Sequence, residues 1–234
     1  MKTWGIIGAM ETEVRLLKES MQDLKISKYA GLEFYQGVLE GKKVVVVRCG
    51  IGKVNAAMCT QLMIDHFYSD CIVNIGVAGA LSDELEIGDI ILSTDLVEHD
   101  FDVRGFGYPK GRIPQMETSI FNASDFLISL AESAGAHLSD LRIHKGRIAT
   151  GDIFVSDRQL REEIRKEFQA LCAEMEGGAM AHVCFLNQIP FLVIRSMSDK
   201  ANGEAMENFS HFEQIAAMNS KKLILEMLKN DIQQ

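Results

Sequence analysis

The sequence has no tract of lysine or arginine, no C-x-x-C pair and no apolar run long enough to cross a membrane. Its formal net charge of −9 argues against non-specific binding to nucleic acid or to an anionic membrane surface. Near the N-terminus, Glu11 and Glu13 interrupt a short apolar run, so we expect neither a signal peptide nor a transmembrane helix. These absences favour a cytoplasmic protein with small-molecule partners.

Cysteine and histidine are also sparse and do not form a pattern. The five cysteines are odd in number and four of them lie in apolar runs, which fits reduced, buried thiols better than a disulfide framework. The six histidines lack the spacing of metal ligands, so we predict no metal site. With 47% apolar residues and no marked boundary, residues 1–234 are expected to form a single domain with a sizeable core.

Continuously apolar segments alternate with helical patterns along the whole chain. Strands are predicted at residues 3–8, 43–48, 71–80, 87–93, 144–149 and 191–196. Helices are predicted at residues 9–20, 53–67, 124–134, 177–186 and 212–229, the third ended by Gly135. Such alternation predicts an α/β fold, a three-layer α/β/α domain around a central mixed or largely parallel sheet.

The first predicted helix carries an acid on its apolar face. Met10, Val14 and Leu17 form the apolar stripe, and the spacing of Glu13 puts it on the same side, whereas Glu11 points outward. An unpaired charge is costly to bury. A glutamate on the apolar face of a helix, just after a strand, is therefore a functional candidate. The alternative is that it only helps to cap the start of the helix. On the second helix we expect Val54, Ala57, Met58 and Leu62 to face inward.

Three acids follow the ends of buried strands at equivalent places. They are Glu13, Asp199 and Glu176, the last within the segment Glu174-Met175-Glu176-Gly177-Gly178. Ligands of open α/β sheets bind beyond the carboxyl ends of the strands, so the three carboxylates are predicted to share one cleft. The alternatives are that Glu174 and Glu176 only favour a helix start and that Asp199 only caps a turn.

Five motifs occur in order along the chain: Gly5 to Val14, Gly50 to Ala57, Gly151-Asp152-x-Phe154, Glu174-Met175-Glu176-Gly177 and Arg195-x-x-Ser198-Asp199. Together they resemble the 5′-methylthioadenosine/S-adenosylhomocysteine nucleosidases of the purine nucleoside phosphorylase superfamily. The resemblance implies a nucleoside phosphorylase-like fold and a homodimer. It also implies hydrolysis of the adenine–ribose N-glycosidic bond of adenine nucleosides, without a metal or an organic cofactor.

The resemblance also implies roles for single residues. Asp199 would help to protonate N7 of the adenine leaving group, Glu13 would activate the attacking water, and Glu176 would hold the ribose hydroxyls. A raised pKa suits the acid, and a carboxylate stabilises an oxocarbenium-like sugar. Further substrate contacts are implied at Met10, Ile51, Ala78, Gly79, Phe154, Val155, Met175, Arg195, Ser198 and Phe209, and from a dimer partner at Val103, Phe106 and Pro114. Arg195 has the alternative role of an ion-pair partner for one of the acids.

Other activities stay open at this point. A phosphorolytic nucleosidase would need several arginines or backbone donors for phosphate, and Arg48 is the one basic residue that keeps this alternative open. Relatives acting on 6-amino-6-deoxyfutalosine share the motifs, and a non-catalytic nucleoside-binding protein would too. Val77 stands where many members of the family have a small hydroxyl residue, a departure that bears on hydrogen bonding at the ribose side. The segment Lys200-Ala201-Asn202-Gly203 lies in a region whose sequence varies, which leaves the preferred 5′ substituent undetermined.

Overall fold

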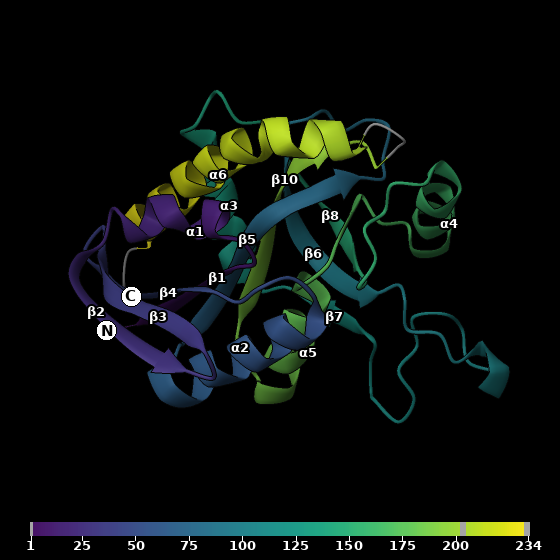
Figure 1. The fold of residues 1–234 in the computed structure, drawn as a ribbon, viewed down its shortest axis with the longest axis horizontal. Coiled ribbons are helices and arrows are strands. Elements are labelled where there is room, and N and C mark those ends of the chain that lie inside the picture. The colour runs from purple at the N-terminus through teal and green to yellow at the C-terminus, as the bar shows by residue number, and fades with distance from the viewer. Residues whose placement is uncertain (1, 202–204, 232–234) are drawn as a thin grey trace.

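A ten-stranded mixed sheet forms the centre of the computed structural model, which describes residues 2–201 and 205–231, with residues 205–211 described by their backbone alone (Figure 1). The strands are β1 (Thr3–Gly8), β2 (Gln22–Tyr29), β3 (Leu32–Leu39), β4 (Lys42–Arg48), β5 (Cys71–Ala80), β6 (Ile90–Glu98), β7 (Ile120–Asn122), β8 (Ile143–Thr150), β9 (Cys172–Glu174) and β10 (Phe191–Asp199). The helices are α1 (Glu11–Lys18), α2 (Lys53–Phe67), α3 (Asp125–Ala136), α4 (Arg158–Phe168), α5 (Gly177–Asn187) and α6 (Ala205–Asn230), with a 3-10 turn η1 (Arg104–Phe106). The predicted α/β class with a mixed sheet is confirmed.

The sheet order is β10-β6-β8-β9-β5-β1-β4-β3-β2, and β10 also pairs with β5. The strands from β5 through β9, β8 and β6 to β10 therefore close into a barrel, which the sequence pattern did not predict. Strands β1, β4, β5 and β10 run parallel, so their carboxyl ends reach the same edge. In contrast, β9 runs antiparallel to β5.

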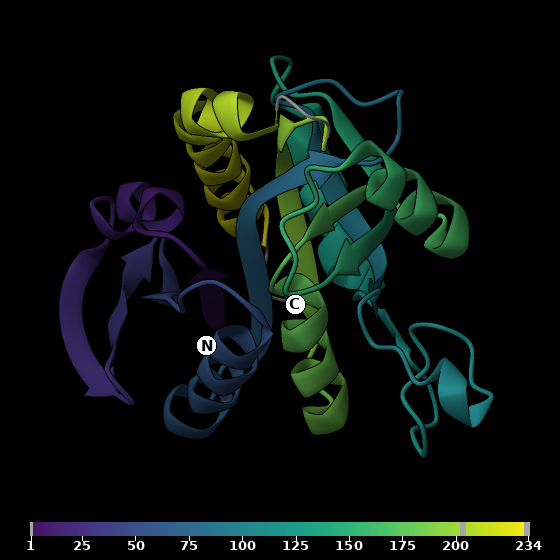
Figure 2. The ribbon, with the colours of Figure 1, turned by 45° about the vertical axis from the view of Figure 1, so that its right-hand side comes forward.

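Helices cover both faces of the sheet (Figures 1 and 2). Helices α1, α3 and α6 lie together on one face, and α2 packs against α5 on the other. The loop between β6 and β7, which carries η1, projects away from the body in both views. The three-layer arrangement leaves the edge of the sheet at the carboxyl ends of β1, β5 and β10 for the site described below.

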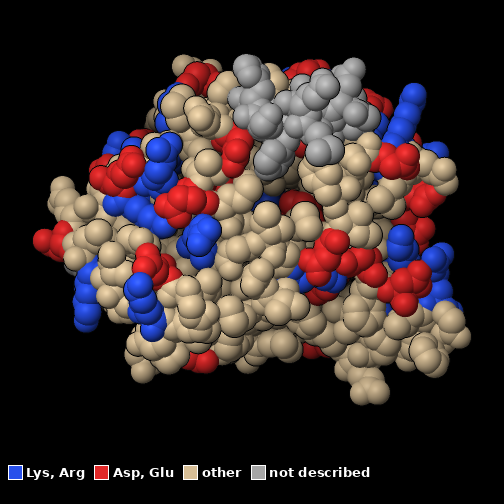
Figure 3. Space-filling model, in the orientation of Figure 1, with Lys and Arg blue, Asp and Glu red and all other residues tan. Residues whose placement is uncertain are grey.

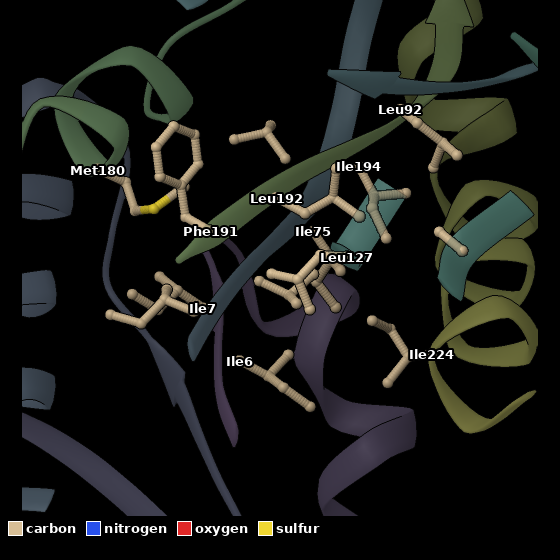
Figure 4. Close-up of a cluster of buried hydrophobic side chains, with 14 of the residues drawn as sticks. Ile6, Ile7, Ile75, Leu92, Leu127, Met180, Phe191, Leu192, Ile194 and Ile224 are labelled. Atoms are coloured by element: carbon tan, nitrogen blue, oxygen red, sulfur yellow. The ribbon is translucent and has the colours of Figure 1, made fainter. Parts of the chain in front are cut away.

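The core lies between the central strands and these helices. Ile6 and Ile7 of β1, Ile75 of β5 and Ile194 of β10 are buried together, with Leu127, Met180 and Ile224 from three different helices around them (Figure 4). Strands buried on both faces are expected to be continuously apolar, as these sequences are. The five cysteines are all free and buried, as predicted from their apolar surroundings.

Two helices differ from the sequence prediction. In α2 the buried residues are Ala56, Cys59, Thr60 and Met63, whereas Val54 is 79% exposed. The inward face predicted for this helix is therefore wrong by about one residue, because apolar side chains lie on more than one of its faces and do not fix its orientation. Helix α3 continues through Gly135, where a Cβ atom would lie 2.2 Å from Ile143. That glycine permits close helix packing and does not end the helix.

The described helices include none long and apolar enough to cross a membrane. On the face of the molecule seen in Figure 3, lysine and arginine are interspersed with aspartate and glutamate and form no broad basic patch.

Candidate active site

A cavity of about 330 Å³ opens at the carboxyl ends of β1, β5 and β10. It lies at the sheet edge where α/β proteins bind ligands. All three acids singled out in the sequence, Glu13, Glu176 and Asp199, line it together with Glu174. The remaining lining is largely apolar, so the carboxylates are held in a partly desolvated space. The other described lining residues are Ala9, Met10, Ile51, Val77, Ala78, Gly79, Ile153, Phe154, Val155, Ala173, Met175 and Ser198.

Glu13 stands in the first turn of α1, directly after β1. Its Oε2 accepts hydrogen bonds from the backbone amides of Ala9 (2.6 Å) and Met10 (2.8 Å), and its Oε1 accepts one from Val77 (3.2 Å). Burial raises the pKa of Glu13, while these amides and the charge of Arg195 oppose the rise. The three amides fix the orientation of the Glu13 carboxylate, and the net rise in its pKa favours the uptake of a proton.

Asp199 is the last residue of β10 and is 2% exposed. The hydroxyl of Ser198 donates to its Oδ2 (2.8 Å) and the amide of Ala201 donates to its Oδ1 (2.7 Å). Burial raises the pKa of Asp199 against these two hydrogen bonds. A carboxyl group with a raised pKa can carry a proton to a basic atom in the cavity.

Glu176 reaches the cavity from α5, where it precedes the first helical residue. The backbone amide of Gly52 donates to its Oε1 at 2.8 Å. Burial and the negative charge of Glu174 raise the pKa of Glu176 to about 7, opposed by Arg195 and by the Gly52 amide. Glu176 was predicted beyond a strand parallel to β1, β5 and β10, but β9 runs antiparallel to β5 and parallel only to β8. The short β9 places Glu176 beside the last residues of β5.

Glu174 serves the structure of the site. Its Oε2 accepts hydrogen bonds from the amides of Glu176 (3.1 Å) and Gly177 (2.7 Å), and its Oε1 accepts one from the hydroxyl of Thr150. It also pairs with the guanidinium of Arg195, which is 1% exposed and does not line the cavity. Arg195 thus forms the ion pair that was its alternative role, and its predicted contact with the substrate stays a prediction.

The other predicted contact residues divide into three groups. Met10, Ile51, Ala78, Gly79, Phe154, Val155, Met175 and Ser198 all line the cavity. Phe209 falls in the stretch 202–211, whose side chains lie outside the described residues. Val103, Phe106 and Pro114 belong to the projecting loop between β6 and β7 and do not line the cavity of their own chain, so their contact with the site of a partner remains a prediction.

Several lining residues escaped the sequence analysis. Ala9, Ile153 and Ala173 line the cavity next to predicted residues, and their small or aliphatic side chains gave no chemical indication. Val77, which the sequence analysis noted only as a departure from the family pattern, lines it as well. Gly52 contributes to the site only through its backbone amide, which donates to Glu176. The glycine turn around it did indicate a close approach of backbone to a ligand, but not the bond to Glu176.

The phosphorylase superfamily matches residues 3–229 of the chain. A 5′-methylthioadenosine/S-adenosylhomocysteine nucleosidase of Pseudoalteromonas translucida is 42% identical over 226 residues, 96% of each chain, and one of Anoxybacillus flavithermus is 42% identical over 97% of this chain and 98% of its own. The crystal structure of the Neisseria meningitidis nucleosidase with methylthio-immucillin-A superposes with a TM-score of 0.94 at 39% identity, covering 98% of this chain and 99% of that one. A futalosine hydrolase of Helicobacter pylori superposes with a TM-score of 0.92 at 34% identity over 97% of both chains.

The chain belongs to the phosphorylase superfamily, in agreement with its fold and with a site at the carboxyl edge of the sheet. Within that superfamily, its resemblance to the 5′-methylthioadenosine/S-adenosylhomocysteine nucleosidases extends over nearly its whole length. The resemblance first drawn from five short motifs is thereby confirmed.

Proposed function

We propose that the protein hydrolyses the N-glycosidic bond of 5′-methylthioadenosine, S-adenosylhomocysteine and related 5′-substituted adenosines. The observation that carries the proposal is one cavity lined by four buried carboxylates in different surroundings, in a chain similar to 5′-methylthioadenosine/S-adenosylhomocysteine nucleosidases. The products would be adenine and the 5′-thioribose. No cofactor takes part in the proposed reaction.

In this proposal Asp199 is the acid. Adenine is a poor leaving group as an anion, so protonation at N7 lowers the barrier to cleavage. The raised pKa of Asp199 supports the role, since the buried carboxyl group retains a proton more readily than an exposed aspartate does.

Glu13 is the base that takes a proton from the attacking water. Three backbone amides orient its carboxylate, and its burial raises the pKa, so that proton uptake is more favourable than at an exposed glutamate. Glu176 accepts hydrogen bonds from the ribose hydroxyls, and its negative charge stabilises the oxocarbenium-like sugar. Met175, next to it in the cavity wall, packs on the sugar.

Water is favoured over phosphate as the nucleophile. None of the described residues that line the cavity is basic, and four of them are acidic. Arg48, the one basic residue that kept phosphorolysis open, has a side chain that is 60% exposed and lies 3.9 Å from Glu11, outside the cavity lining. An anionic phosphate would therefore meet repulsion without a compensating cation.

One experiment separates the candidate functions. The protein is incubated with 5′-methylthioadenosine in phosphate-free buffer and again with phosphate, and the sugar product is identified. Free methylthioribose without phosphate supports hydrolysis, whereas a strict phosphate requirement with a sugar 1-phosphate product would refute it. Binding without turnover would indicate a nucleoside-binding protein.

A second substrate is favoured by the similarity to the futalosine hydrolase of Helicobacter pylori. We include 6-amino-6-deoxyfutalosine in the same assay, and the ratio of kcat/KM for the two nucleosides decides which 5′ substituent the enzyme prefers.

The proposed assembly is a homodimer in which Val103, Phe106 and Pro114 reach the cavity of the partner. Phe106, on the loop between β6 and β7, is 83% exposed, and Val54 of α2 and Leu186 of α5 expose further apolar surface. Large exposed apolar side chains of this kind commonly mark protein interfaces. Light scattering measures the mass in solution, and a monomer at assay concentration would exclude this role of the loop.

A further inference from the structure

Hydrogen bonds among Lys53, Asp100 and Asp152 form a closed ring beside the cavity. The backbone amide of Lys53 donates to Asp152 Oδ1 (2.8 Å), and the backbone amide of Asp152 donates to Asp100 Oδ2 (2.9 Å). The ammonium group of Lys53 closes the ring by donating to Asp100 Oδ1 (2.7 Å). The ring therefore joins the start of α2 to the segments that follow β6 and β8.

The ring touches two parts of the cavity wall. Gly52, directly before Lys53, donates its amide to Glu176, the proposed ribose ligand. Ile153, Phe154 and Val155, directly after Asp152, line the cavity. The family resemblance implies that Phe154 and the backbone of Val155 contact the adenine base. A displacement of the ring would thus change the sugar side and the base side of the site together.

The backbone at Gly52 depends on this arrangement. Its φ of 96° and ψ of 165° lie in a region that is essentially restricted to glycine, and a Cβ atom here would lie 2.9 Å from Asp152 Oδ1. Gly52 is the N-cap of α2 and has no side chain to satisfy the first helical amides. Asp152 supplies from another segment an acceptor for the amide of Lys53, the first of the helical amides that have no partner within the helix.

Charge balance holds Lys53 in place. Its ammonium group lies between Asp100 and Glu98, whose Oε2 is 3.0 Å away, and Glu98 also pairs with His182 of α5 (3.2 Å). Burial lowers the pKa of Lys53, but the hydrogen bonds to the two carboxylates outweigh it and raise the pKa overall. The lysine is therefore a permanent cation that links α2 to the segment after β6 and, through Glu98, to α5.

We propose that Lys53, Asp100 and Asp152 are positioning residues that hold the Gly52 amide against Glu176 and hold residues 153–155 in the cavity wall before substrate binds. The inference rests on the proposed function of Glu176. Glu13 and Asp199 stand on α1 and β10, outside the ring. Loss of the ring should therefore weaken substrate binding more than it slows the chemical step.

The test compares Asp152→Ala and Asp152→Asn with the wild-type enzyme in 5′-methylthioadenosine hydrolysis. Asp152→Ala removes the acceptor for Lys53, and we expect KM to rise about tenfold or more while kcat changes by less than about threefold. Asp152→Asn keeps an oxygen acceptor at the same place, so KM should return to within about threefold of the wild-type value. If Asp152→Ala does not fold, Lys53→Met opens the same ring and is expected to raise KM in the same way.

The matched control is Asp70→Ala. Asp70 also accepts a backbone amide from another segment, that of Thr3 at 2.7 Å, but at the amino ends of β1 and β5, the opposite end of these strands from the cavity. We expect both Asp70→Ala and Asp152→Ala to lower Tm, but Asp70→Ala should leave KM unchanged. An unchanged KM in Asp152→Ala, a fall in kcat alone, or an equal KM change in Asp70→Ala would overturn the proposal.

Failure of the proposed function would look different. If the wild-type enzyme does not turn over 5′-methylthioadenosine, that function is refuted, and the ring is then tested by calorimetry with adenine as the probe. A Kd about tenfold weaker in Asp152→Ala than in the wild type and in Asp152→Asn would support the ring, and equal Kd values would refute it.

Discussion

Arg195 lies against Glu174, with Nε donating to Glu174 Oε2 at 3.1 Å, while its terminal nitrogen lies 3.9 Å from Glu176. A further hydrogen bond reaches Asn74 Oδ1 at 2.5 Å. A single buried cation thus compensates several buried carboxylates. Arg195→Met should leave these acids unpaired in a low-dielectric environment and lower the free energy of unfolding by about 3–5 kcal/mol. Urea denaturation at pH 8 measures the change.

The control for this variant is Arg104→Ala, which removes an ion pair with Asp102 on the surface. Exposed pairs are screened by solvent, so the urea midpoint should not move. A loss of less than about 1 kcal/mol in Arg195→Met would contradict the view that Arg195 compensates the buried acids.

Glu13→Gln tests the proposed base. The amide side chain cannot take up the proton of water, so kcat should fall by about 10²- to 10⁴-fold. The shape is kept and a buried charge is removed, so Tm should change little by comparison. Steady-state kinetics and a thermal melt measure the two effects, and near-normal turnover would remove this role from Glu13.

A steric variant tests the placement of the same carboxylate. A Cβ atom at Gly76 would lie 2.8 Å from Glu13 Oε1, so Gly76→Ala should displace Glu13 and lower kcat. The control Gly5→Ala crowds Met63 in the core at 3.0 Å, and there we expect a loss of stability without a specific loss of kcat.

Asp199→Asn tests the proposed acid. An asparagine keeps one acceptor oxygen for the amide of Ala201, and its NH2 group can donate to the hydroxyl of Ser198, but it cannot deliver a proton to adenine N7. We expect kcat to fall by about 10²- to 10⁴-fold, with a Tm close to that of the wild type. A nucleoside whose base is a good leaving group without protonation should recover part of the lost rate, and equal losses for both substrates would argue against Asp199 as the acid.

The sequence was sufficient for the features that local patterns determine. The apolar stripe of Met10, Val14 and Leu17 predicted that Glu13 faces inward, and Val14, Leu17 and Glu13 are indeed buried. The apolar runs of β1, β5 and β10 predicted parallel strands whose ends meet at one edge. These predictions succeeded because burial on both faces imposes a composition that single segments display.

The sequence did not predict which strands or side chains far apart in the chain pair with one another. Nothing in the short segment Cys172–Glu174 indicates that β9 is antiparallel to β5, and Glu176 was placed in the cleft by an argument that holds only for parallel strands. The sequence offered an ion pair as one role of Arg195, but it did not identify Glu174, 21 positions away, as the partner. The ring around Lys53 joins residues that lie up to 99 positions apart. Periodicity reports on which face is buried and carries no information about such partners.

Glu176 makes stability depend on pH. Its pKa is about 7 in the folded protein and 4.5 ordinarily, so between these values the folded state holds a proton that the unfolded state has released. The free energy of unfolding should therefore fall as pH rises through this window. The stabilisation is fully present below pH 4.5, is lost above about pH 7, and amounts to about 3 kcal/mol. Urea denaturation between pH 5 and pH 8, in about half-unit steps, measures the slope.

Glu176→Gln isolates this contribution, because the raised pKa values of Glu13 and Asp199 give slopes of the same sign that remain in the variant. We expect the pH slope between about 5 and 7 to be smaller in Glu176→Gln than in the wild type, and unaltered in the control Glu40→Gln, an exposed turn residue. The KM of the wild type should rise as pH falls below about 7, since a protonated Glu176 is a weaker acceptor for the ribose hydroxyls. Identical slopes in the variant and the wild type would show that Glu176 titrates near its ordinary pKa, and its proposed charge in the site would then not depend on pH in this range.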